Sequence, residues 1–222
     1  MKTLYKLKNI NLNYLLNGNN IKILKNINFE IKKNESVAII GESGSGKTSL
    51  LMLMSGLENP TNGSIVFNGE DLSEISDKRR TEIRKKKIGL IFQQFFLIPN
   101  YTALENVMFP MQINEIKNEK EKAISILEDF GLIHRKNNLP SELSGGEQQR
   151  VAIARAISFE PDIVLADEPT GNLDRRNTEI VSDLLLEYSR KRKISLIVVT
   201  HNMKIAGKCD RVMKLIDGQI KF

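Results

Sequence analysis

S-V-A-I-I-G-E-S-G-S-G-K-T, residues 36–48, is the stretch that decides the fold of this chain. It opens with a short apolar, β-branched run, which is typical of a strand covered on both faces of a parallel sheet. From Gly41 to Thr48 it matches the phosphate-loop pattern, and a helical pattern, Thr48 to Leu57, begins there. A strand, a glycine-rich loop and a helix in this order predict an α/β fold with a phosphate-binding site.

The glycine-rich loop carries the residue types that bind the phosphates of a nucleotide. Glycines let the backbone curl so that successive N–H groups face phosphate oxygens. Lys47 reaches the terminal phosphates, and the Thr48 hydroxyl is a ligand for Mg²⁺. An ordinary glycine-rich turn is the alternative, but the strand before the loop and the helix after it disfavour that interpretation. The predicted binding residues are Gly41, Ser43, Gly44, Ser45, Gly46, Lys47, Thr48 and Ser49.

Apolar runs alternate with helical patterns along the rest of the chain, which predicts a mostly parallel sheet covered by helices. Residues 1–35 and 63–68 instead alternate and turn often, so we expect an antiparallel β flank there. From about residue 94 to 158 no convincing strand occurs, which indicates an inserted helical lobe. The remaining predicted strands are 88–92, 163–166, 195–200 and 212–216, and the remaining predicted helices are 119–130, 147–158 and 178–191.

A second glycine element, L-S-G-G-E at residues 143–147, is followed at once by Q-Q-R. It lies at the head of the predicted helix 147–158, where free backbone N–H groups attract anions. Because the phosphate loop lies far upstream, we expect one chain to carry two anion-binding half-sites.

Polar side chains follow two predicted strands at the edge of the sheet. Asp167 and Glu168 follow the run 163–166, and a strand tip is a costly place for paired acids unless cations or a substrate compensate them. We expect Asp167 to hold Mg²⁺ and Glu168 to accept the proton of an attacking water. His201 follows the run 195–200 and emerges at the edge where open α/β sheets bind ligands. An acidic turn and an ordinary surface or core histidine are the structural alternatives.

The composition of the chain limits its class. Its 222 residues, 41% of them hydrophobic, are enough to bury a substantial core. The net charge of +6 is a mild excess, for which solvated surface lysines are the favoured explanation over a face near anionic lipid or nucleic acid. The single cysteine, Cys209, excludes an intramolecular disulfide. The apolar runs are much shorter than the ~18 residues of a membrane span, so we expect another chain to supply any spanning part.

A basic cluster at residues 78–87 contains Lys78-Arg79-Arg80 and Arg84-Lys85-Lys86-Lys87. We predict a solvated helix face, with a surface near phospholipid and a nucleic-acid patch as less favoured alternatives, because no aromatic residues are interleaved. His134 has no partner pattern and is predicted to be a surface residue.

Taken together, these motifs resemble the ATPase of ABC transporters over essentially the whole chain. The resemblance implies one domain, residues 1–222, with a RecA-like P-loop NTPase core and an antiparallel β flank in residues 1–93 and 159–222. Residues 94–158 would form an inserted α-helical subdomain that carries the family's signature, residues 143–147. The elements occur in the family's order: residues 41–48, Gln93 within Phe92-Gln93-Gln94, residues 143–147, Asp167-Glu168 followed by Gly171 to Asp174, and His201.

The resemblance also implies the cofactors ATP and Mg²⁺, with each ATP held head to tail between two copies of the chain. Lys47, Glu168 and His201 would be catalytic, and His201 would hold the γ-phosphate and the attacking water. Tyr14 would stack on adenine, although local strand packing is an alternative and Tyr5 is a weaker candidate. Across the interface, the γ-phosphate would be contacted by Ser144, Gly145 and Gly146. Gln93 would sense Mg²⁺ and the membrane partner, and Asp174 would link the two sites. The metal residues would be Thr48, Gln93 and Asp167.

Within the family, residues 92–99, 102–107 and 165–174 look like the lipoprotein-release and macrolide or peptide efflux branch, the LolD and MacB types. This implies a subunit peripheral on the cytoplasmic face of the inner membrane, with an integral-membrane permease as partner and no nucleic acid expected. A cell-division ATPase of the FtsE type, which matches 102–107 less well, and other non-transport ABC ATPases are the alternatives. One departure from the pattern is Glu147, which stands where Gln is commoner.

Overall fold

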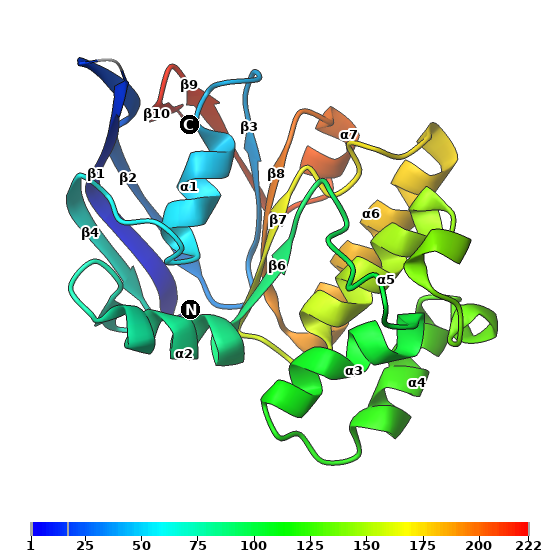
Figure 1. The fold of residues 1–222 in the computed structure, drawn as a ribbon. Coiled ribbons are helices and arrows are strands. Elements are labelled where there is room, and N and C mark those ends of the chain that lie inside the picture. Colours follow the sequence, from blue (N-terminus) through cyan, green and yellow to red (C-terminus); the bar gives the residue numbers. More distant parts are fainter. Residues whose placement is uncertain (1, 17, 222) are drawn as a thin grey trace.

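Two β-sheets with a helix between them form the frame of the computed structural model, which describes residues 2–16 and 18–221 (Figure 1). The larger sheet has the strand order β10-β9-β3-β8-β7-β6, and the smaller one has the order β2-β1-β4-β5. The strands are β1 Thr3–Leu16, β2 Asn19–Lys32, β3 Ser36–Ile40, β4 Asn62–Phe67, β5 Glu70–Asp71, β6 Ile88–Ile91, β7 Ile163–Asp167, β8 Ser195–Thr200, β9 Arg211–Ile216 and β10 Gln219–Lys221.

The larger sheet is parallel except for the hairpin of β9 and β10, which confirms the predicted α/β class. All residues of β3 and β8 are buried, as their unbroken apolar runs predict for strands covered on both faces. Because these neighbouring strands run parallel to β7, their carboxyl ends meet at one edge. The phosphate loop follows β3, Glu168 follows β7 and His201 follows β8 at that edge.

The smaller sheet is the antiparallel flank that frequent turns predict. Strand β1 pairs with β2 on one side and with β4 on the other. The alternating exposure along β2 places its apolar residues against the core and its polar residues in solvent.

Helices cover both faces of the larger sheet, with α1 between the two sheets and α3, α5 and α6 on the opposite side (Figure 1). Residues 94–158 contain α3, α4 and α5 and two short 3₁₀ turns, 133–135 and 140–142, and no strand among them. The boundaries of a helical subdomain stay a prediction. The helices are α1 Lys47–Met54, α2 Asp77–Lys87, α3 Ala103–Ile113, α4 Glu119–Asp129, α5 Gly145–Ile157, α6 Arg175–Arg192 and α7 Met203–Ala206.

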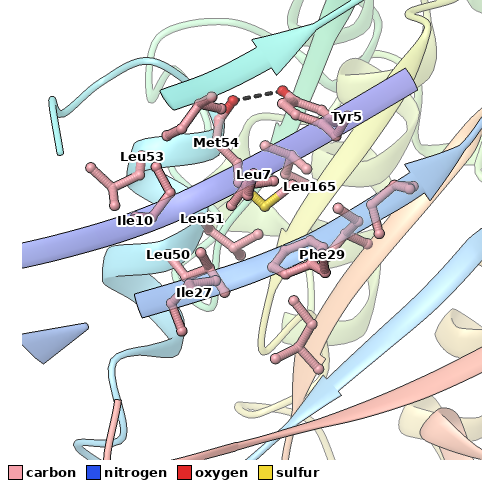
Figure 2. Close-up of a cluster of buried hydrophobic side chains, with 14 of the residues drawn as sticks. Tyr5, Leu7, Ile10, Ile27, Phe29, Leu50, Leu51, Leu53, Met54 and Leu165 are labelled. Carbon is pink, nitrogen blue, oxygen red and sulfur yellow. Dashed lines mark hydrogen bonds between the residues drawn. The ribbon is translucent and has the colours of Figure 1, made fainter. Parts of the chain in front are cut away.

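One hydrophobic core locks α1 between the two sheets. Leu50, Leu53 and Met54 of α1 are fully buried among side chains from β1 and β2 (Figure 2). Tyr5 is also fully buried, and its hydroxyl donates a 2.6 Å hydrogen bond to the Met54 carbonyl at the end of α1. Because Lys47 is the first residue of α1, this packing also determines where the phosphate-loop lysine stands.

A second core covers the other face of the sheet, where side chains of α3, α4 and α5 pack with β6, β7, β8 and α6. The predicted helical lobe therefore shares its core with the parallel sheet. The helix α5, which begins at the second glycine element, therefore belongs to the same core as β7 and β8, the strands that lead to Asp167 and His201.

Two helices begin earlier than their apolar patterns predict. Helix α5 starts at Gly145 because Ser144 and Glu147 form a reciprocal capping box. Helix α6 starts at Arg175 because the Asp174 carboxylate accepts a 2.9 Å hydrogen bond from the Asn177 N–H. In both cases a side-chain cap, rather than hydrophobic periodicity, sets the first helical residue.

Candidate nucleotide site

An open hollow of about 600 Å³ lies above the edge where the strands end. It brings together the phosphate loop, Gln93, Asp167, Glu168 and His201, which come from four different elements. The lining consists of Ile23, Gly41, Glu42, Ser43, Gly44, Gly46, Lys47, Thr48, Ser49, Gln93, Asp167, Glu168 and His201.

The backbone of the loop forms a tight cradle. Gly44 and Gly46 have φ angles of 82° and 99°, a left-handed region that suits glycine. A Cβ at Gly46 would lie 2.9 Å from a methyl carbon of Leu24, so the loop packs closely against β2. The Ser45 hydroxyl oxygen is buried without a hydrogen-bond partner. A buried unpaired hydroxyl is costly, and a phosphate oxygen at the loop would satisfy it.

Lys47 is buried, and its ammonium group donates to the carbonyls of Gly41 at 2.9 Å and Glu42 at 2.8 Å. These bonds turn the side chain back over the loop. The charged nitrogen therefore already lies over the cradle in which phosphates would sit, held by two carbonyls that a stronger anionic partner would replace.

Thr48 and Asp167 supply the oxygen ligands that suit Mg²⁺. Burial raises the pKa of Asp167 and the neighbouring Glu168 carboxylate adds to that rise, while a hydrogen bond with the Thr48 side chain and the charge of Lys47 act against it. Among the described residues there is no group of three His, Cys, Asp or Glu side chains that could hold a metal by themselves. Mg²⁺ commonly binds through one or two protein oxygens plus substrate phosphates, so Thr48 and Asp167 fit this ion.

Glu168 and His201 form a pair at the ends of β7 and β8. The Glu168 Oε1 atom lies 3.0 Å from His201 Nδ1, and the His201 backbone N–H donates to Oε2 at 3.4 Å. Glu168 has a φ of 44°, and its own N–H donates to the Val199 carbonyl at 2.9 Å. The carboxylate is mostly shielded while the imidazole is mostly exposed. This arrangement is suited to orienting a water for proton abstraction.

Gln93 reaches the hollow from the segment after β6. Its side-chain N–H donates to Asn172 Oδ1 at 3.2 Å, and the Asn172 side chain donates to the Gln93 carbonyl at 3.0 Å. This reciprocal pair ties Gln93 to the turn between Glu168 and Asp174. Sequence reasoning missed Asn172, which lies inside a stretch that the resemblance covers.

The signature element lies outside the hollow: Ser144, Gly145 and Gly146 are not among its lining residues. Ser144 is exposed at the start of α5, and Gly146 packs against α6. A Cβ at Gly146 would lie 2.4 Å from Asn177 Oδ1, and the Asn177 side chain donates to Asp174 Oδ2 at 2.6 Å. One chain therefore holds the signature and Asp174 together, apart from its own phosphate loop.

The two candidate adenine-stacking tyrosines differ in accessibility. Tyr14 is 42% exposed, and its hydroxyl donates to Glu58 Oε1 at 2.5 Å. Burial and the Glu58 hydrogen bond raise the pKa of Tyr14, which also contacts Ser49. Tyr5 is fully buried in the core, so the expectation that it could take the same role is wrong. The stacking role of Tyr14 stays a prediction.

The exposure of three side chains outside the hollow can be compared with the sequence predictions. His134 is exposed, as predicted. Arg80, predicted to face solvent with the rest of its cluster, is instead buried, and its guanidinium bonds the Leu72 carbonyl, Asn59 and Asp77. Cys209 is partly buried, which raises the pKa of its thiol.

None of the described helices combines the length and the apolar character needed to cross a membrane.

The fold and the hollow define a P-loop nucleotide-binding protein with a histidine-bonded carboxylate, Glu168, at the strand edge. The family model described as "ABC transporter" matches residues 24–171, so the chain belongs to the ABC transporter ATP-binding family, whose activity is ATP hydrolysis. This confirms the resemblance on which the expectations of ATP binding and ATPase activity rest.

Similar proteins extend the match along nearly the whole chain. The "Lipoprotein-releasing system ATP-binding protein LolD" of Syntrophus aciditrophicus (strain SB) is 43% identical over 217 residues, 97% of each chain. The protein of the same name from Legionella pneumophila (strain Paris) is 46% identical over 90% of this chain and 89% of its own. The dimeric structure of MJ0796, described as a bacterial ABC transporter cassette, has a TM-score of 0.91 and 39% identity, covering 99% of this chain and 97% of its own.

The same cassette is also known in a dimeric post-hydrolysis state bound to ADP and Pi. That structure has a TM-score of 0.90 and 38% identity, again over 99% of this chain and 97% of its own.

Proposed function

We propose that this ATPase is the ATP-hydrolysing subunit of a lipoprotein-releasing transporter. The two relatives named for a lipoprotein-releasing system share 43% and 46% identity with the chain over at least 90% of its length. Similarity of that extent supports a common partner, an integral-membrane permease. The subunit would then work on the cytoplasmic face of the inner membrane.

The Glu168–His201 pair beside the phosphate loop carries the catalytic part of the proposal. Lys47 exchanges the carbonyls of Gly41 and Glu42 for the terminal phosphates of ATP. Glu168 takes the proton of the attacking water, and His201 keeps the carboxylate oriented. Thr48 and Asp167 would hold Mg²⁺, with Gln93 nearby, and the ion would neutralise phosphate charge when bound.

We further propose that two copies of the chain complete each site. The signature and Asp174 lie together but outside the hollow that contains the phosphate loop. A head-to-tail arrangement would place Ser144, Gly145 and Gly146 of one copy opposite the phosphates held by the other. The dimeric states of the MJ0796 cassette, at 38–39% identity, support this arrangement.

Gel filtration of the Glu168→Gln variant tests the composite site. We expect a dimer in ATP and a monomer in ADP, because ATP would bind and persist without its proton acceptor. A variant that stays monomeric at saturating ATP would contradict the composite site.

Reconstitution with the permease tests the transport function. The chain and its permease partner would be placed in proteoliposomes loaded with a lipid-anchored lipoprotein, and release into the aqueous phase would be measured. We expect ATP-dependent release by the wild type and none by Glu168→Gln. ATP-driven export of a macrolide or peptide, without lipoprotein release, would favour the efflux branch instead.

A further inference from the structure

An ion pair lies directly behind the signature element. Glu147, in the first turn of α5, is 13% exposed, and its Oε1 accepts a 2.9 Å hydrogen bond from the Arg135 Nε–H. Its other oxygen, Oε2, accepts from the Ser144 N–H and the Ser144 hydroxyl, both at 2.8 Å. Both carboxylate oxygens are therefore in use, one by the signature serine and one by Arg135.

Glu147 places a negative charge next to the residues that would meet a phosphate. Burial acts to raise its pKa, but the hydrogen bonds from Ser144 and the Arg135 guanidinium outweigh burial, and the pKa lies below its usual value. The carboxylate is therefore ionised at neutral pH. The N–H groups of Gly145 and Gly146, in the first turn of α5, have no acceptor within the helix and favour an anion there. An uncompensated carboxylate on that turn opposes such an anion.

We propose that Arg135 is a positioning residue for the signature. Arg135 neutralises Glu147 and holds the Glu147 carboxylate on Ser144, so that the start of α5 accepts the γ-phosphate of the partner's ATP. This rests on the proposed composite site. Arg135 lies in the 3₁₀ turn 133–135, twelve residues before Glu147, and needs no contact with the nucleotide. Its effect on ATP passes through the charge of Glu147.

A purely structural role for the pair would be small. The Arg135 side chain is 40% exposed and makes one hydrogen bond to Glu147. Without Arg135 the shielded Glu147 carboxylate still has its two hydrogen bonds from Ser144, so we expect the loss of folding free energy to be modest. The charge nevertheless lies within the first turn of α5, where the field of a helix terminus is strongest. Loss of Arg135 should therefore change assembly in ATP more than it changes the stability of the fold.

Glu168→Gln is the parent protein for the test, and the dimer dissociation constant is measured by analytical ultracentrifugation at saturating MgATP. A charge at a helix terminus changes binding by roughly two- to fivefold per site, and a symmetric dimer contains two such sites. We expect Arg135→Gln to weaken dimerisation by about tenfold. Binding of a fluorescent ATP analogue to the dilute monomer should not change, since the phosphate loop is intact.

Rescue is the decisive arm of the experiment. Glu147→Gln removes the charge that Arg135 neutralises, so the double variant Arg135→Gln/Glu147→Gln should dimerise within about twofold of Glu147→Gln alone. Arg135→Lys, which keeps the positive charge, should stay within about threefold of the parent. Arg79→Gln is the matched control, because Arg79 of α2 forms an ion pair with Glu70 of β5, outside the nucleotide hollow.

The outcomes separate this proposal from the one on which it rests. If the parent dimerises and Arg135→Gln matches it, or if Glu147→Gln does not rescue Arg135→Gln, the role of Arg135 is refuted and the composite site stands. If the parent itself stays monomeric in ATP, both are refuted. Thermal unfolding of each variant shows whether a loss of dimer comes from a loss of fold. If Arg135→Gln does not fold, the dimer dissociation constant of Arg135→Lys is compared with that of the parent instead.

Discussion

The imidazole of His201 is hydrogen-bonded to the carboxylate of Glu168, with 3.0 Å between Nδ1 and Oε1. Parallel pairing of β7 with β8 brings the two residues together. Asp167 pairs with Val199, Glu168 directly follows Asp167, and His201 lies two residues after Val199. The His201 backbone N–H adds a second, longer contact to the same carboxylate. A carboxylate bound from two directions has one preferred orientation, which is what a general base needs.

Removal of His201 should therefore lower the turnover number while leaving ATP bound. For Glu168→Gln we expect a loss on the order of 10²–10⁴ in kcat, because the proton acceptor is gone. His201→Ala should lose less than Glu168→Gln, since the acceptor remains but is no longer oriented. Phosphate release in the presence of the permease measures both, and ATP binding is checked separately.

His134→Ala is the matched control, because this other histidine is exposed and outside the hollow. Its turnover should equal that of the wild type. Wild-type turnover in Glu168→Gln would contradict the assignment of the general base.

Lys47→Ala should lose ATP binding and also weaken the empty loop. The ammonium group bonds two loop carbonyls, and a buried hydrogen bond from a charged donor contributes roughly 1.5–3 kcal/mol. We expect a lower free energy of unfolding without nucleotide, by about 1–3 kcal/mol. Urea denaturation and fluorescent-ATP titration measure the two effects. Lys22→Ala, at an exposed lysine of β2, should change neither.

The two signature glycines should respond differently to alanine. A Cβ at Gly145 would meet only Phe95 Cζ at 3.8 Å, so Gly145→Ala should leave the monomer as stable as the wild type or slightly more stable. At Gly146 the Cβ would displace Asn177 from the cap of α6, which should cost about 1 kcal/mol of unfolding free energy. Thermal unfolding distinguishes them.

Both glycine variants should weaken ATP-driven dimerisation if the signature faces the partner. Gly145→Ala is made in the Glu168→Gln background and compared with Glu168→Gln alone. If the two dimerise equally well, the signature lies away from the interface.

Tyr14→Phe and Tyr14→Ala separate stacking from the hydroxyl contact. If the ring stacks on adenine, Tyr14→Phe keeps the ATP affinity and Tyr14→Ala loses roughly 1–3 kcal/mol, because base–aromatic stacking has that magnitude. Glu58→Gln tests whether the 2.5 Å bond from the Tyr14 hydroxyl holds the ring in place. Equal affinities of all three variants and wild type would support local strand packing.

Cys209 should react slowly with alkylating reagents at neutral pH. Burial, with the Asp210 charge, raises the pKa of its thiol to about 11, and only the thiolate reacts. The rate with iodoacetamide should rise about tenfold per pH unit up to that range, since the thiolate fraction does. Above the ordinary pKa of a thiol, the folded state keeps a proton that the unfolded chain releases. The free energy of unfolding therefore falls as the pH rises above that pKa. The chain in urea is the control and should react readily at pH 8–9.

The strands and the phosphate loop were predictable because their signals are local. An unbroken apolar run and a glycine pattern act within a few residues, and strand β8 has the predicted bounds, 195–200. The starts of α5 and α6 were predicted two or three residues late, although the spacing of Ser144 to Glu147 is a cap signal that could have placed one of them.

Tertiary packing decided what lies far apart in the sequence. Tyr5 looked like a strand aromatic near the nucleotide, yet the core between β1 and α1 encloses it. Arg80 belongs to a basic run, yet it is buried against Asn59 and the Leu72 carbonyl. Neither outcome has a local signal, because side chains many residues away form these environments.

By itself the sequence determined the class of fold, the phosphate loop, the acidic strand tip and the order of the motifs, since each depends on short-range periodicity or spacing. Only the tertiary structure decided that Glu168 meets His201, that Gly146 packs on the cap of Asp174, and that Arg135 bonds Glu147. It also decided that the signature stands apart from its own phosphate loop. The reason is that parallel pairing and shared cores set distances between elements, which no local pattern encodes.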